Sequence, residues 1–143
     1  MFNAGGITST EYVNIDQILA NTNFVAISAI IDNTAKNASG KCLAGTPLKG
    51  DFTKRDGGAN AFVEASAGTP AAGTTPAVPS DANCVLLHDI DFDGSNDANG
   101  TVLIKGTVQL KHMASATEEK WTALVIEALA ANGINAINPT PAS

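Results

Sequence analysis

Two stretches of the chain have the apolar pattern of β-strands. Residues 24–31 (FVAISAII) are rich in β-branched side chains, and residues 101–110 (TVLIKGTVQL) alternate apolar and polar positions. Gly106, in the middle of the second stretch, predicts a bulge or the close approach of another backbone. Side chains of alternate residues point to the same face of a strand, so the second stretch predicts one shared face: Val102, Ile104, Gly106, Val108 and Leu110.

A third stretch, residues 84–92 (CVLLHDIDF), also predicts a strand. A loop of Asp, Asn and Gly joins it to the strand at residues 101–110. Two strands connected by such a loop are expected to pair, which predicts a hairpin over residues 84–110.

The remaining strand signals are weaker. Residues 44–52 predict a loop or an edge segment, because Pro47 has no N–H to donate and excludes a central strand there. Residues 61–63 and 134–137 are each expected to form a short strand.

One long helical pattern covers residues 116–131. Ser115 and Glu118 have the spacing of a capping box, and Gly133 is placed to end the helix. The apolar residues of this pattern recur at i, i+3, i+4, i+7 and i+8 and predict one buried stripe: Trp121, Leu124, Val125, Ala128 and Leu129.

The length of 143 residues predicts one domain. Residues 1–23 are expected to be a flexible N-terminal arm with room for a short helix, residues 24–138 a single β-rich domain, and residues 139–143 a C-terminal tail. Residues 64–83 are mainly Ala, Gly, Thr, Ser and Pro and predict a long surface loop, because they offer little apolar surface to offset the entropy of ordering. The expected fold class is mainly β (α+β), a small β-sandwich or barrel-like domain with the hairpin and one C-terminal helix.

Charge and hydropathy exclude two classes of partner from the expectation. The formal net charge is −6, and the segment from Asp56 to Ile104 contains seven acidic residues and no Lys or Arg. Such a segment repels phosphate, so no nucleic acid partner is expected. The apolar run at residues 24–31 is far too short to cross a bilayer, so no membrane partner is expected. The N-terminus lacks the basic and apolar regions of a secretory signal, which predicts synthesis in a cytoplasm.

The hairpin loop carries the most specific candidate site. Its acidic residues occupy positions 1, 3, 5 and 9 of a calcium-loop pattern, with Gly94 at position 6. The bidentate carboxylate expected at position 12 is replaced by Gly100, and both flanks predict strands. A turn-forming acidic loop is therefore favoured over a metal site, and neither a metal nor a cofactor is expected. The four candidate ligands are Asp89, Asp91, Asp93 and Asp97.

The cysteines and histidines offer little chemistry. Cys42 and Cys84 are isolated, with no CxxC motif, and are expected to be reduced thiols. His88 and His112 have no partner at metal-ligand spacing. The fold could bring a Cys and a His together, so a small hydrolase that uses Cys84 or His88 stays open as an alternative. The expectation is that the chain is not an enzyme and has no catalytic residues.

Several segments, in this order, are similar to one known group of proteins. Residues 84–93 (CVLLHDIDFD) and 99–110 (NGTVLIKGTVQL) resemble the signature "VLLHDVD … NGTVLIxGxVxL". Residues 44–48 (AGTPL) resemble the segment that precedes this signature, and residues 120–129 the helix that follows it. Over about residues 41–137 the chain therefore resembles the head decoration, or head-fibre, proteins of tailed-phage capsids, of the lambda head-decoration type.

This resemblance implies a structural protein of the virion that sits on the outer capsid surface. It implies a homotrimer that binds the major capsid protein and cements the shell, with residues 1–23 as an arm that orders on the capsid. A different class stays open: an extracellular adhesion or carbohydrate-binding module stabilised by calcium. The acidic loop and the Ala-, Gly-, Thr- and Asn-rich composition motivate this alternative.

Overall fold

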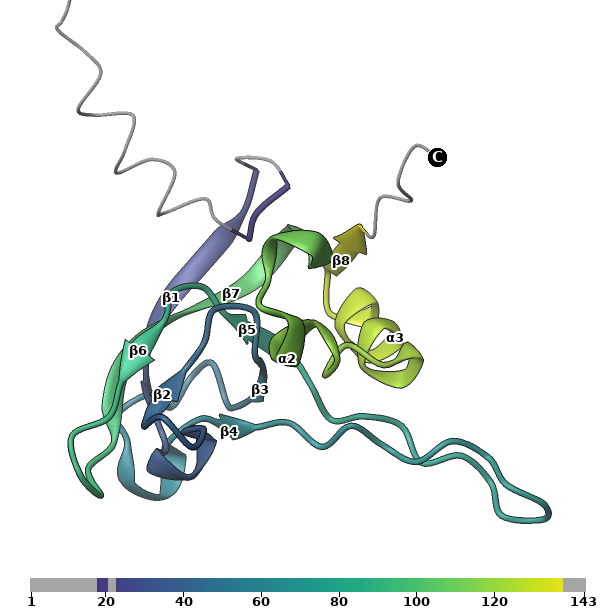
Figure 1. Ribbon diagram of the computed structural model, residues 1–143, viewed down its shortest axis with the longest axis horizontal. Coiled ribbons are helices and arrows are strands. Elements are labelled where there is room, and N and C mark those ends of the chain that lie inside the picture. Colours follow the sequence, from purple (N-terminus) through teal and green to yellow (C-terminus); the bar gives the residue numbers. More distant parts are fainter. Residues whose placement is uncertain (1–17, 21–22, 138–143) are drawn as a thin grey trace, which may run out of the picture.

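The computed structural model describes residues 18–20 and 23–137, so the predicted tail at residues 139–143 lies outside it. Within the described residues a six-stranded sheet has the order β1-β7-β5-β3-β4, and β8 pairs with β7 (Figure 1). The β7–β8 pair is parallel and the other pairs are antiparallel. The fold is mainly β with a helix near the C-terminus, as predicted. The strands of this sheet are β1 (Val25–Ile31), β3 (Pro47–Lys49), β4 (Val63–Glu64), β5 (Cys84–Leu86), β7 (Ala98–Gln109) and β8 (Ile134–Ile137).

The predicted hairpin forms between β5 and β7, but its first strand is divided. Of the stretch predicted at residues 84–92, only the first three residues pair with the main sheet. The later strand β6 (Ile90–Asp91) pairs instead with β2 (Lys41–Cys42) in a separate two-stranded sheet. Between the two parts, the Asp89 carboxylate accepts a hydrogen bond from the Ala44 N–H at 2.7 Å and holds the chain where it passes from one sheet to the other.

A bulge in β7 overturns the prediction of one apolar face along that strand. The register of β7 against β1 skips Ile104, so side chains beyond this residue point to the opposite face. Val102 and Val108, predicted to share a face, are both fully buried but belong to different core clusters. The predicted close approach at Gly106 is confirmed, because a Cβ built there would lie 3.0 Å from the Cβ of Phe24.

The main sheet is buried on both faces, which gives the fold its sandwich-like character. Neighbouring residues of β5 alternate between the two clusters: Cys84 and Leu86 belong to one, and Val85 to the other. The cluster around Val85 also contains the apolar side of the C-terminal helix. The cluster around Cys84 extends to Phe62 and Cys42.

The helix predicted over residues 116–131 forms as two pieces, α2 (Ser115–Glu118) and α3 (Ala123–Ala131). The break places Trp121 between them. Its indole N–H donates to the carbonyl oxygen of Gly45 at 2.8 Å, and the side chain is buried. Since a buried indole N–H needs an acceptor, this long-range bond explains why the chain leaves the helical path here.

The ends of these helices differ in part from the prediction. No capping box forms from Ser115 and Glu118, because Ala114 holds the N-cap position and makes no side-chain bond. Thr122 caps α3 instead, accepting a bond from the N–H three residues further on. Gly133, with φ of 91°, follows the end of α3 as predicted.

Residues 1–17 of the predicted arm lie outside the described residues, but its next segment is part of the core. Leu19 forms a bridge with Val108 of β7, and the Gln109 N–H donates to the Ile18 carbonyl at 2.8 Å. Both Ile18 and Leu19 are buried. The helix expected in the arm therefore does not include this segment, which is extended along β7.

The exclusion of Pro47 from a central strand is also wrong, since β3 is paired on both sides. The Pro47 carbonyl accepts a bond from the Ala65 N–H at 3.1 Å, on the side of β4. Carbonyl and amide nitrogen of one strand residue face the same neighbour, so the missing N–H also faces that side. The missing N–H faces Ala65, just beyond the end of β4 at Glu64, so the proline removes one bond at the end of this ladder and none from the pairing with β5.

Candidate interaction surface

The stretch predicted as a surface loop is a two-stranded ribbon, here defined as residues 66–80, that projects far from the body of the protein (Figure 1). Thr69 and Val78 exchange two backbone hydrogen bonds of 2.8 Å, and Ala72 and Thr75 exchange two of 3.1 and 2.8 Å. Every residue from 69 to 79 is exposed. The ribbon therefore offers its side chains to solvent on all sides.

Glycines and prolines set the path of the ribbon. Gly73 lies at the tip with φ of 57°, in the region that favours glycine. Gly68 has φ of 79°, and a Cβ there would lie 2.6 Å from the Val78 carbonyl oxygen, so only glycine lets the two strands pass this closely. Three residues restrict φ and remove N–H donors from the strands: Pro70, Pro76 and Pro79.

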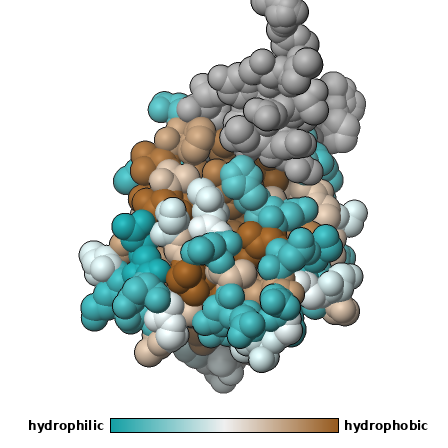
Figure 2. Space-filling model, turned by 90° about the vertical axis from the view of Figure 1, so that its left-hand side faces the viewer, coloured by the Kyte–Doolittle hydropathy of each residue, from teal (hydrophilic) through white to brown (hydrophobic). Residues whose placement is uncertain are grey.

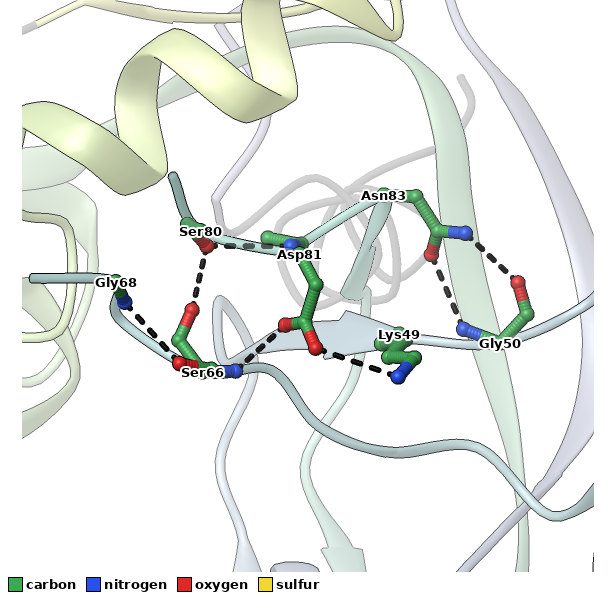
Figure 3. A network of polar contacts seen from close by, with 8 residues as sticks. Lys49, Gly50, Ser66, Gly68, Ser80, Asp81 and Asn83 are labelled. Carbon is green, nitrogen blue, oxygen red and sulfur yellow. Dashed lines mark hydrogen bonds and ion pairs between the residues drawn. The ribbon is translucent and has the colours of Figure 1, made fainter. Parts of the chain in front are cut away.

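A network of polar contacts fixes the base of the ribbon (Figure 3). The Ser80 hydroxyl donates to the Ser66 carbonyl at 2.6 Å and accepts from the Ala82 N–H at 3.1 Å. The Asp81 carboxylate accepts from the Ser66 N–H at 2.7 Å and pairs with the Lys49 ammonium at 3.4 Å. The two strands of the ribbon are thus bound to each other and to the end of β3.

A second pair of contacts continues this network into the next turn. The Asn83 side-chain amide donates to the Gly50 carbonyl at 2.7 Å, and its oxygen accepts from the Gly50 N–H at 3.1 Å (Figure 3). A reciprocal bond of this kind fixes the side-chain amide at both of its ends. The ribbon therefore projects from a base that is cross-linked by polar groups.

A groove runs between the returning strand of the ribbon and α3. Its volume is about 360 Å³, and its wall on the ribbon side is residues 79–83. Of the charged side chains that line it, Asp81 and Glu127 are both acidic. On the other side of the base, a second groove of about 490 Å³ shares Asp81 and Asn83 with the first. The apolar lining of the first groove consists of small or aliphatic side chains: Pro79, Ala82, Leu124, Ala128 and Ala131.

The carboxylates of the predicted calcium loop do not converge. Asp89 and Asp97 accept bonds from backbone N–H groups of distant loops, at 2.7 and 2.9 Å, while Asp91 pairs with Lys41 at 3.1 Å. The backbone carbonyl of Asp93 accepts a turn bond from a residue three positions on. Across residues 18–20 and 23–137, no group of three or more His, Cys, Asp or Glu side chains could hold a metal ion. The acidic loop instead ties separate segments of the backbone together.

The tip of this loop is held by a residue that the sequence did not single out. The Asn33 side-chain amide donates to the carbonyls of Gly94 and Asn96 at 3.0 and 2.9 Å. The Lys36 ammonium donates to the same Gly94 carbonyl at 3.0 Å. These contacts join residues about sixty positions apart, so no local sequence pattern predicts them.

Both thiols lie in the hydrophobic core, and they are free. Burial raises the pKa of the Cys42 thiol and, more strongly, that of the Cys84 thiol. A nucleophilic cysteine needs a lowered pKa, so neither environment favours the hydrolase alternative. His88 is half-buried and His112 is exposed.

Comparison with known proteins adds no relative. A scan against models of protein families and a search of curated proteins each found no match. Among the described helices, none is long and apolar enough to cross a membrane.

Proposed function

We propose that the protein is a structural decoration protein that binds the outer surface of a tailed-phage capsid as a homotrimer and stabilises the shell. The observation that carries this proposal is the ribbon, an exposed and projecting element fixed at its base to a sheet buried on both faces. A cementing protein needs a firm body and an element that reaches its neighbours, and this chain has both.

The ribbon suits binding because its conformation is fixed before any partner arrives. Its prolines and its base contacts restrict the free state, so less conformational entropy is lost on association. A rigid element of this kind favours a contact role over the role of a passive linker.

The assignment to a capsid comes from the sequence resemblance at residues 84–110, which cover β5, β6 and β7. The most similar part of the chain is thus its structural centre. Many copies on one shell bind with high avidity even where each contact is weak, so a small surface per copy is sufficient.

The surface on the side of β1 is suited to a reversible contact. Figure 2 shows this face, the left-hand side of Figure 1, with apolar areas set among hydrophilic ones. Val25 of β1 is 48% exposed, and interfaces that form between separately folded proteins typically have such a mixed surface. The proposal places the capsid contact on this side of the molecule, where Val25 supplies an exposed apolar side chain.

The test uses particles that normally incorporate the protein, prepared without it. Purified protein added to these capsids should co-sediment with them, appear as density at local three-fold positions in electron micrographs, and raise the temperature at which the capsids burst. Capsids that do not bind the protein, or that are equally robust with and without it, would contradict the proposal.

A further inference from the structure

We infer that the ribbon is a self-association arm, and that its distal part, residues 69–78, seats in the groove beside α3 of a second copy of this chain. The inference rests on the self-association in the proposed function, and it does not depend on the capsid.

Beyond its base, the ribbon packs against no described part of its own chain. All of residues 69–79 are exposed, and the Val78 side chain is 55% exposed. An isolated two-stranded hairpin is only marginally stable in water, and it gains stability when its side chains are covered. The ribbon is therefore an element with most of its contact surface still unused.

The ribbon is long enough to reach well into a neighbouring molecule. Gly73 at the tip lies seven positions after Ser66 at the base, which at ~3.3 Å per residue gives a reach of roughly 23 Å. A compact chain of 143 residues has a radius of gyration of roughly 15 Å. A second copy can thus bind the tip while the two bodies stay side by side.

Charge favours a second copy as the occupant. Each chain carries a formal net charge of −6, so contact between most surfaces of two copies brings like charges together. Residues 65–80 contain no charged side chain, and this segment approaches another copy without that penalty. The groove has an acidic lining at Asp81 and Glu127, which accepts a neutral ribbon and disfavours an acidic one.

The groove and the ribbon also match in chemistry. The groove offers small apolar side chains from α3 and from residues 79–83, and the ribbon offers small Ala, Thr and Pro side chains to cover them. The prolines leave gaps in the N–H donors along the edges of the ribbon, so further strands cannot pair with these edges without limit. When the ribbon of each copy fills the groove of the next, the contacts are heterologous, and a rotation of one third of a turn between copies closes them into the trimer of the proposed function.

The test places a photo-crosslinker on the ribbon tip. The protein carries Thr74→Cys labelled with benzophenone maleimide, and it is prepared in unlabelled and in ¹⁵N-labelled form and mixed before illumination. The native cysteines are buried and do not compete for the label. Mass spectrometry should find mixed light–heavy crosslinks from position 74 to the groove, in residues 79–83 or 123–132. Ser95→Cys, an equally exposed position on the acidic loop, is the matched control and should give no such crosslinks.

Light scattering gives an independent readout. Thr74→Asp adds a negative charge next to the acidic groove and should weaken self-association by about tenfold or more, whereas Ser95→Asp should leave it unchanged. A variant with residues 70–77 replaced by Asn-Gly keeps the base and should be monomeric with unchanged circular dichroism.

The outcomes separate this inference from the proposed function. An oligomer that survives the shortened ribbon, or tip crosslinks confined to one chain or absent from the groove, would overturn the self-association arm. Capsid binding by the same oligomer would then leave the decoration function standing. If the shortened variant kept its oligomeric state and lost only capsid binding, the ribbon would be a capsid contact and the inference would be wrong.

Discussion

The Ser80 hydroxyl is the contact on which the position of the ribbon depends most directly. It donates to the Ser66 carbonyl at 2.6 Å and accepts from the Ala82 N–H at 3.1 Å, and Ser80 is buried. Ser80→Ala removes both bonds and adds no atom that could clash. The change therefore tests whether the polar base, and not the ribbon sequence alone, holds this element in place.

The expected cost follows from the surroundings of the two partners. An intramolecular hydrogen bond contributes about 1 kcal/mol net, and a buried donor left without a partner costs about 1–3 kcal/mol. The Ser66 carbonyl lies on an exposed residue and can bind water, but Ala82 is 2% exposed and its N–H cannot. The free energy of unfolding should fall by about 2–4 kcal/mol, a large part of the about 5–15 kcal/mol typical of a domain.

Urea denaturation followed by circular dichroism measures this cost. With a urea dependence of about 2 kcal/mol/M, the midpoint should fall by roughly 1–2 M. Hydrogen exchange at the Thr69 and Val78 amides, which bond each other's carbonyls at 2.8 Å, should become faster. The urea midpoint reports the global loss of stability, and hydrogen exchange at the two amides reports local opening of the ribbon.

Ser66→Ala is the matched control. It removes a hydroxyl from the same network, but this hydroxyl accepts only the Gly68 N–H, at 3.2 Å, on an exposed segment. The expected loss is about 0.5–1 kcal/mol. If Ser80→Ala costs no more than Ser66→Ala and leaves exchange in the ribbon unchanged, the base does not hold the ribbon and the reasoning fails.

Three further measurements follow from the site. Burial raises the pKa of Cys42 and Cys84, so neither thiol should react with a labelling reagent at pH 8 until denaturant is added; rapid labelling of the native protein would contradict their placement in the core. Bonds from the threonine two residues on, first its hydroxyl and then its N–H, lower the pKa of Asp32 and of Asp51. A lowered folded-state pKa stabilises the fold above the ordinary value of 3.8 and loses this effect as the pH falls below it, so the double variant Asp32→Asn, Asp51→Asn should lose less stability between pH 5 and pH 2 than the unaltered protein. Calcium and chelator should leave the thermal midpoint unchanged, and a rise with calcium would favour the adhesion-module alternative.

The parts of the fold that the sequence predicts well are those whose signal is local and periodic. The strand at residues 24–31 and the pairing of β5 with β7 follow from apolar pattern and turn chemistry alone. The errors arise where a distant contact decides. The bulge at Ile104 inverts half of a strand, and the indole bond of Trp121 interrupts a helix whose periodicity is otherwise continuous.

The ribbon shows the same limit at the level of the candidate site. Its composition correctly indicates an exposed segment, but the hairpin is not predicted, although Gly73 and Thr74 form a two-residue loop between the paired residues Ala72 and Thr75. Composition gives no indication of the base, because the carbonyl, hydroxyl and carboxylate groups that meet there come from residues about 15 to 33 positions apart. A low-complexity segment can therefore be ordered when polar contacts join its two ends to each other and to a neighbouring strand.

The base and the tip of the ribbon are expected to respond differently to substitution. At the base, Ser80 and Gly68 hold a geometry that the rest of the ribbon cannot hold alone, because its small side chains bury little apolar surface. At the tip, Thr74 is exposed, so its replacement should change the free energy of unfolding by less than about 0.5 kcal/mol. If the ribbon were an inert loop, a charge at its tip would change neither the free energy of unfolding nor self-association. If the ribbon is an arm that contacts a partner, the same charge leaves the free energy of unfolding unchanged but weakens self-association. This difference between the two measurements distinguishes an arm from an inert loop.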